Sequence, residues 1–285
     1  MTCDALQHEI IEALKWYADH GVHDVVNDEP HNRLEPNVTQ TSSFHQIPEV
    51  QCKSELSSNK SKTEQTVAFL GKSEACDEAI RCAKQVKTLE ELSQAIKDFE
   101  GIAIKKTASN MVFSDGNPQA DIMIVGEAPG ADEDRLGKPF AGLNGQLLDR
   151  ILDCIDLSRT SDNPKQAVYL SNILNWRPPG NRTPSTAEIE ISLPFIEKHI
   201  QLVAPKILLL CGGVAAKSLL GRSESISRLR KSCYEYVPQT PDFQAEKASI
   251  PAIATYHPSY LLRTPLQKKL VWEDMISLRK RISSL

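Results

Sequence analysis

No two of the seven cysteines in this 285-residue chain are separated by two residues only, so the sequence has no CxxC motif. Their number is odd, and Cys154 and Cys211 lie in apolar, periodic segments typical of a protein core. Cysteines used in this way indicate a reducing compartment rather than a disulfide framework. The sequence therefore predicts a cytoplasmic protein.

Long apolar runs are also missing. No segment approaches the roughly 20 apolar residues that a membrane helix needs, so no contact with a membrane is expected. Residues 1–4 lead into an amphipathic segment that contains acids, and neither a secretory signal nor a transit peptide is evident. The chain also lacks GxGxxG followed by an acid about 20 residues later, which argues against a Rossmann-like nucleotide-binding enzyme.

The net charge is small, −4 at pH 7, but it is unevenly distributed. Residues 1–85 contain 8 Lys/Arg and 14 Asp/Glu, a net charge of −6, which leaves 25 and 23 in the rest, a net charge of +2. The charge of residues 86–285 therefore neither favours nor excludes a polyanionic partner such as a nucleic acid.

The composition changes near residue 86. Residues 4–19 carry apolar side chains at helical spacing, and residues 30–66 are rich in polar residues and proline with almost no periodicity. We expect a short amphipathic helix followed by a disordered linker, which together form an N-terminal extension of residues 1–85. The helix either packs on the protein's own core or binds a protein partner.

Short apolar runs alternate with helical patterns over residues 86–285. The runs cover residues 111–113, 121–125, 167–172, 206–211 and 253–256, and the helices 88–99, 144–155, 186–203, 213–220 and 266–283. Strands that alternate with helices predict a mainly parallel sheet with helices on both faces. The fold class is therefore α/β, a three-layer αβα domain.

The most informative segment is DIMIVGEAPGADEDRLGKPFAGLNGQ, residues 121–146. An apolar run ends at Gly126, and a turn rich in glycine and proline follows, with acids at Glu127, Glu133 and Asp134. The aromatic Phe140 comes just before the next helix. Enzymes with α/β folds place their chemistry outside the carboxyl ends of such strands, although an ordinary turn with a solvated acidic face would look similar.

Three other strand ends carry polar or flexible residues. Asn172 closes one strand, Gly212 and Gly213 follow another, and His257 follows the last. Because the carboxyl ends of parallel strands meet at one edge of a sheet, these residues should line a single cleft.

The segments GEAPGADEDRLGKPFAGLNGQLLDR, VYLSNILNWRPPGNRTPS and YHPSYLLR resemble the family 4 uracil-DNA glycosylases of the uracil-DNA glycosylase superfamily. The resemblance covers most of residues 99–275. It implies a hydrolase of DNA base excision repair that flips uracil out of DNA and cleaves its N-glycosidic bond. The implied partner is uracil-containing DNA, single- or double-stranded, and we expect a monomer.

The resemblance also implies roles for the residues at the strand ends. Gly126, Phe140 and Asn172 would bind the uracil, with Phe140 stacking on the base and Asn172 distinguishing uracil from cytosine. His257 would stabilise the negative charge on the departing base. Carboxylates would stabilise the sugar cation and orient water, with Glu127 and Glu133 as first candidates and Asp134 next. Some superfamily members carry an acid where this chain has Ala131.

DNA contacts are expected from cations and from the segment after His257. Backbone amides of the glycine-rich turns would bind phosphates, and Leu261 would either enter the vacated base stack or simply pack at the start of a helix. The residues expected to contact DNA are Arg177, Arg182, Arg228, Arg230, Ser259, Leu261 and Arg263.

Family 4 enzymes usually hold a 4Fe–4S cluster with four cysteines. The corresponding positions here are Phe99, Ile102, Trp176 and Ser192, and none can supply a thiolate. We therefore expect neither a metal nor another cofactor. The three bulky residues are expected to form a small hydrophobic plug bordered by Ser192.

Two other functions compete with this prediction. The chain could be a catalytically weak protein that binds uracil or DNA, or one associated with replication, because the cluster cysteines and the acid at Ala131 are missing. A related branch captures uracil sites covalently through a histidine. Residues 183–187 contain no histidine, which argues against that chemistry.

Overall fold

The computed structural model describes residues 72–244 and 249–284. The expected helix at 4–19 and linker at 30–66 lie outside the described residues. Within them, four parallel strands form the centre of one six-stranded sheet, in the order β1-β3-β2-β4-β6-β5. The strands are β1 (Asp115–Gly116), β2 (Ile122–Gly126), β3 (Val168–Asn172), β4 (Ile207–Cys211), β5 (Cys233–Tyr236) and β6 (Ile250–Thr255). Only the edge strands β1 and β5 pair antiparallel.

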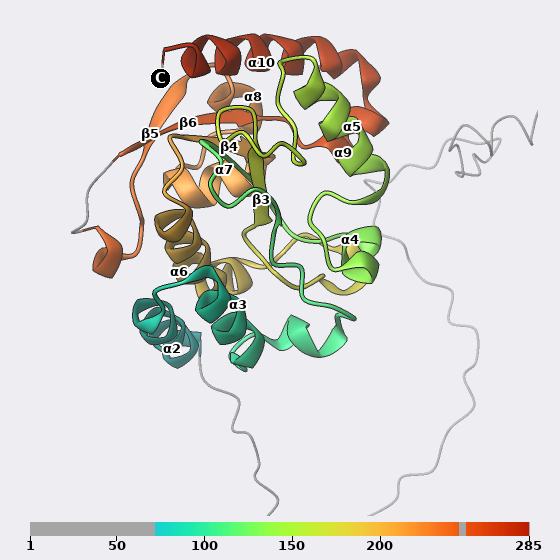
Figure 1. The fold of residues 1–285 in the computed structure, drawn as a ribbon. Helices are drawn as coiled ribbons and strands as arrows, with labels where there is room; N and C mark the ends of the chain where they lie inside the picture. The colour runs from blue at the N-terminus through green and yellow to red at the C-terminus, as the bar shows by residue number, and fades with distance from the viewer. Residues whose placement is uncertain (1–71, 245–248, 285) are drawn as a thin grey trace, which may run out of the picture. The chain divides into compact units, whose positions relative to one another are not determined.

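Helices cover both faces of this sheet, as Figure 1 shows. On one face lie α5 (Gly142–Asp153), α9 (Pro258–Arg263) and α10 (Lys268–Ile282), and on the other α2 (Lys72–Gln85), α3 (Leu89–Asp98), α6 (Thr186–Val203) and α7 (Gly213–Leu220). The short helices α4 (Ala131–Leu136) and α8 (Ile226–Leu229) follow β2 and α7. The expected three-layer αβα fold with a mainly parallel sheet is confirmed.

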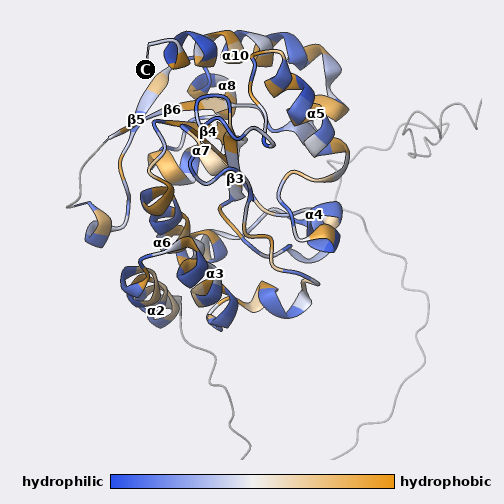
Figure 2. Ribbon diagram, in the orientation of Figure 1, coloured by the Kyte–Doolittle hydropathy of each residue, from blue (hydrophilic) through white to orange (hydrophobic). Residues whose placement is uncertain are grey.

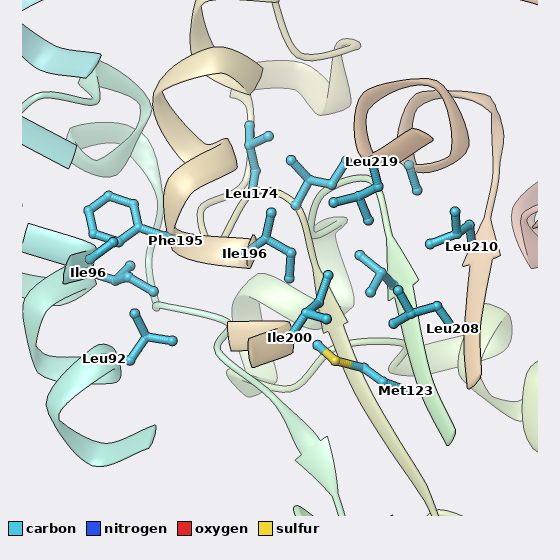
Figure 3. Packing of buried hydrophobic residues seen from close by; sticks show 14 of the residues in the cluster. Leu92, Ile96, Met123, Leu174, Phe195, Ile196, Ile200, Leu208, Leu210 and Leu219 are labelled. Carbon is cyan, nitrogen blue, oxygen red and sulfur yellow. The ribbon is translucent and has the colours of Figure 1, made fainter. Parts of the chain in front are cut away.

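Alternation along the central strands divides the core between the two helical layers. Met123 and Leu208 pack in the cluster that contains α3 and α6 (Figure 3), whereas Ile122 and Leu209 pack in the cluster with α5 and α10. All residues of β2, β3 and β4 are buried, which explains why β2 and β4 are apolar without interruption and why β3 is apolar up to Ser171 and Asn172 at its end. Hydrophilic and hydrophobic residues mix along the outer helices (Figure 2), as expected for helices with one face on the sheet.

The folded part begins before residue 86. Helix α2 buries three alanines at four-residue spacing, Ala75, Ala79 and Ala83, and packs on α6. Helix α2 belongs to the same folded unit as the sheet. The last part of the expected extension is therefore a helix of the folded unit, because its small residues allow close contact between helices.

Two local expectations differ from the structure. Residues 111–113 do not form a strand; the edge strand lies at β1, two residues further on, and β5 carried no signal in the sequence analysis. Edge strands are short and partly exposed, so they lack the continuous apolar pattern of central strands. Among the helices of the described residues, none is long and apolar enough to cross a membrane.

Candidate active site

The carboxyl ends of four parallel strands meet at one edge of the sheet. Gly126 at the end of β2 pairs with Asn172 at the end of β3, and Cys211 of β4 pairs with Thr255 of β6. Strand β2 lies between β3 and β4 in the sheet. The chain passes from β2 to β3 on one side and then continues with β4 on the other side, so the topological switch point lies between β2 and β4. Ligands bind at such a point in open α/β sheets.

The expected uracil-binding residues lie against one another. Asn172 and Phe140 are 3% and 2% exposed, although they are 32 residues apart in the chain. A β-carbon on Gly126 would overlap Asn172 Oδ1 and would lie 2.8 Å from Phe140 Cζ. Glycine is therefore required at position 126, because both side chains pass directly over its backbone.

Phe140 connects this group to His257. The two rings stack with their centroids 5.6 Å apart and an angle of 26° between their planes. Phe140 has φ 49°, in the left-handed region that non-glycine residues rarely adopt. Strained backbone of this kind persists only where surrounding contacts hold it, and it is frequent at functional sites.

His257 is held in one tautomer by the start of α9. Its Nδ1 accepts a hydrogen bond from the backbone N–H of Ser259 at 3.2 Å and lies 2.8 Å from Ser259 Oγ. Because Nδ1 accepts, the proton of the neutral ring is on Nε2. Burial, and then the nearby positive charge of Arg263, lower the pKa of His257 to about 4. The ring is therefore neutral at physiological pH.

Two carboxylates face the same space. Burial raises the pKa of Glu127 above its ordinary value. Burial also raises the pKa of Glu133, although its Oε2 accepts a 2.8 Å hydrogen bond from the backbone N–H of Gly130. Glu133 thus closes the first turn of α4 and is fixed in position.

A cleft of about 660 Å³ opens at this edge. Six of the expected site residues line it: Glu127, Glu133, Arg182, His257, Ser259 and Arg263. The lining also contains residues that sequence reasoning missed, namely Asn144, Thr183, Ile226, Ser227, Tyr256 and Tyr260. The two tyrosines flank the His257-Pro-Ser motif, and this closeness was the only signal that could have identified them.

Like Gly126, Phe140 and Asn172, Asp134 is not among the residues that line the cleft, although it was expected as a further catalytic acid. It is buried, and its Oδ1 accepts hydrogen bonds from the backbone N–H groups of Ser109 and Asn110 at 2.8 and 3.0 Å. The carboxylate satisfies the backbone of a loop on the other side of α4, because successive helical residues point in different directions.

Two of the expected DNA contacts are core residues instead. Arg230 has a side chain only 6% exposed, which forms a bidentate ion pair with Asp274 at 2.8 and 3.1 Å. Leu261 is fully buried in the cluster with α5 and α10, while Leu262 is 43% exposed. The ion pair with α10 holds the Arg230 side chain, and the core holds that of Leu261. Neither side chain is therefore free to contact DNA.

The other cations differ in how strongly they are engaged. Arg182 pairs with both oxygens of Glu188 at 2.6 and 2.8 Å, and Arg177 donates to Asn181 at 2.7 Å and lies 3.8 Å from Asp134. Arg228 is exposed in α8. Hydrogen bonds within the loop thus hold both Arg177 and Arg182, and of these two cations Arg182 lines the cleft.

The four residues expected at the cluster positions come together in the core. Phe99, Ile102, Trp176 and Ser192 are all buried and surround a void of about 10 Å³. The Phe99 ring packs edge-on against Phe195 with centroids 5.1 Å apart. Within the part of the chain that the structure describes, no group of three or more His, Cys, Asp or Glu residues is arranged to hold a metal ion.

Several known proteins are similar to this chain over the part that carries the cleft. A family model described as the uracil DNA glycosylase superfamily matches residues 113–276. A type-4 uracil-DNA glycosylase of Pyrobaculum aerophilum is 33% identical over 191 residues, which cover 66% of this chain and 91% of the relative. Proteins of the same name are 32% identical in Archaeoglobus fulgidus, over 63% of this chain and 86% of the relative, and 31% identical in Thermotoga maritima, over 66% and 91%.

Proposed function

Because this chain belongs to the uracil-DNA glycosylase superfamily, we propose that it removes uracil from DNA by hydrolysing the N-glycosidic bond, the first step of base excision repair. The observation that carries this proposal is one group of contacts at the switch point of the sheet: Phe140 and Asn172 lie against Gly126, and the ring of His257 stacks on Phe140.

The first step is extrusion of the uracil nucleotide. A base inside a duplex is unreachable, and flipping it costs a few kcal/mol, of the order of its lost stacking and pairing. Phe140 offers a face on which the pyrimidine stacks, and the Asn172 carboxamide both donates and accepts along one edge of the base. Uracil presents an acceptor where cytosine presents an amine donor, so Asn172 selects uracil.

Bond cleavage then separates charge. The electron pair of the N-glycosidic bond leaves on uracil, and positive charge develops on the sugar. The neutral His257 ring, protonated on Nε2, donates a hydrogen bond to the oxygen on which the negative charge develops. A ring fixed before the reaction needs no reorganisation when the charge appears, and the contacts at its Nδ1 fix it.

Glu127 is the best-placed base for the attacking water. Water oxygen adds to the anomeric carbon of the sugar, and its proton passes to the Glu127 carboxylate. The raised pKa of Glu127 makes it a stronger base than an exposed glutamate. Glu133, held by Gly130, contributes negative charge beside the sugar cation.

The rim of the cleft supplies the contacts to DNA. Arg182, Ser259 and Arg263 line the cleft and lie where phosphates flanking the flipped nucleotide would pass. Leu262 is exposed next to Arg263. Leu262, rather than Leu261, can therefore enter the space that the flipped base leaves in the DNA stack.

The residues at the cluster positions do not fit an iron–sulfur cluster. Thiolates ligate such clusters, whereas this site offers two hydrocarbon side chains, a serine and an indole whose buried N–H has no hydrogen-bond partner among the described residues. We propose that apolar packing replaces the cluster and supports the loop from Trp176 to Thr183 from behind. No catalytic step depends on a metal.

If apolar packing replaces the cluster, a substitution in it should lower the stability of the protein, and the purified protein should contain no iron. Trp176→Ala is expected to lower the free energy of unfolding by about 3–5 kcal/mol, because it leaves a cavity in the core. Trp272→Ala is a matched control, since Trp272 is 47% exposed, and should cost less than about 1 kcal/mol. Denaturant titration measures both. Stoichiometric iron in the purified wild-type protein would contradict the proposal.

The activity itself is tested on a labelled oligonucleotide that contains one uracil. After incubation with the purified protein, alkali should cleave the strand at the abasic site. An otherwise identical strand with thymine is the control, and it should stay intact. An undamaged uracil strand at protein excess would refute the proposed function.

A further inference from the structure

Arg159 lies in the connection between α5 and β3 and contacts the backbone of Phe140. Its side chain is 14% exposed and binds two carboxylates: Nε lies 2.8 Å from Asp149 Oδ1, and Nη1 lies 3.0 Å from Asp115 Oδ2. These partners come from α5 and β1, so the guanidinium links two elements of the fold. Two negative charges hold it in a fixed orientation.

The remaining N–H groups of Arg159 bind the backbone that carries the aromatic ring. Nη1 donates to the carbonyl of Pro139 at 3.3 Å, and Nη2 donates to the carbonyl of Phe140 at 3.1 Å. A β-carbon on Gly145 would overlap the same Phe140 carbonyl, so this oxygen is enclosed between the guanidinium and the start of α5.

These contacts explain how Phe140 keeps its left-handed backbone. Such a conformation costs a non-glycine residue about 1–3 kcal/mol, and surrounding structure must compensate for it. The guanidinium reaches two carbonyls and two carboxylates at once because its donors are spread over a rigid plane. The single ammonium of a lysine cannot span all four acceptors.

We propose that Arg159 is a positioning residue that sets the orientation of the Phe140 ring over the uracil subsite. This inference depends on the proposed function, because the ring matters only if a base stacks on it. Arg159 does not line the cleft and acts on the substrate only through the 139–140 backbone.

A double-mutant cycle tests this proposal. Arg159→Met is expected to lower kcat/KM for uracil excision by about 10- to 100-fold, because small displacements of a binding group have effects of this size. In a Phe140→Leu background the same substitution should cost less than about 3-fold, because the ring that it positions is absent. Arg159→Lys keeps the charge, should fold more readily and should show the same pattern with a smaller loss.

A loss of activity in Arg159→Met could come from lower stability of the whole protein and not from a displaced Phe140 ring, so a control variant must separate the two effects. Glu197→Gln is a matched control, because buried Glu197 binds the backbone N–H groups of Gln239 and Thr240, and none of these residues lines the cleft. It should lower the denaturation midpoint and leave kcat/KM unchanged. Equal losses for Arg159→Met in both backgrounds would overturn the proposal, as would an unchanged kcat/KM in the single variant.

A ¹⁹F NMR measurement tests the positioning role of Arg159 without depending on catalytic activity. With 4-fluorophenylalanine at position 140, the ¹⁹F resonance should be single and sharp, and Arg159→Met should broaden or shift it. An unchanged resonance would overturn the positioning role whatever the activity. An inactive wild type with a responsive resonance would instead refute the proposed function alone.

Discussion

Asn172→Ala is expected to lower kcat/KM for uracil excision by about 10³-fold. Asn172 is 3% exposed and lies against Gly126, so a shortened side chain leaves a gap that no neighbour fills. Sites that hydrogen-bond a substrate lose discrimination by large factors when the bond is missing, since a buried polar group is then unpaired. Single-turnover excision from a uracil oligonucleotide measures this loss.

Asn175→Ala is the matched control for this substitution. Asn175 is buried three residues further along, and its carboxamide donates to the carbonyl of Val112 at 3.0 Å, whereas that of Asn172 lies against Gly126. It should lower stability and leave base selection unchanged. Retention of more than a tenth of the wild-type kcat/KM by Asn172→Ala would contradict the assigned role.

His257→Ala is expected to lower kcat by about 10²- to 10³-fold, the loss typical of one preorganised donor to a developing anion. The same role predicts the pH dependence. The pKa of His257 is lowered to about 4, so the neutral ring persists from alkaline pH down to that range. The wild-type rate should therefore show no decline near pH 6.5 that is due to His257.

Two comparisons make this prediction specific. Any acidic decline that persists unchanged in His257→Gln belongs to another group, with Glu127 the first candidate because its pKa is raised. His199→Gln is the control, because this fully buried ring stacks on Phe113 and lies outside the cleft lining. A decline near pH 6.5 that disappears only in His257→Gln would show that the ring titrates normally.

Most of the architecture could be predicted because burial leaves a direct record in the sequence. The runs that became β2 and β4 are apolar throughout, and the run of β3 is apolar up to Ser171, since parallel strands have helices on both faces. Helix α6 begins with a capping box of Ser185 and Glu188, which is likewise a local pattern of the sequence. The edge strands β1 and β5 were not predicted, because short, partly exposed strands have little pattern.

The candidate site followed from chain order and strand ends. Glu127, Asn172 and His257 were expected together because they lie at or just after the ends of parallel strands, and the family resemblance added Phe140 to the uracil site. The structure stacks Phe140 on His257 and places Phe140 and Asn172 against Gly126. Side-chain directions were less predictable. Asp134 and Glu133 are neighbours in sequence, yet only Glu133 lines the cleft, because helical geometry turns adjacent residues by about 100°.

By itself, then, the sequence determined the fold class, the edge of the sheet that carries the chemistry and the identity of the central residues, because hydrophobic period and motif order are local properties. Tertiary structure alone decided that Arg230 and Leu261 are core residues, that Ser259 fixes the tautomer of His257, and that Arg159 supports Phe140. These outcomes depend on which distant groups are adjacent in space, and no local pattern records that.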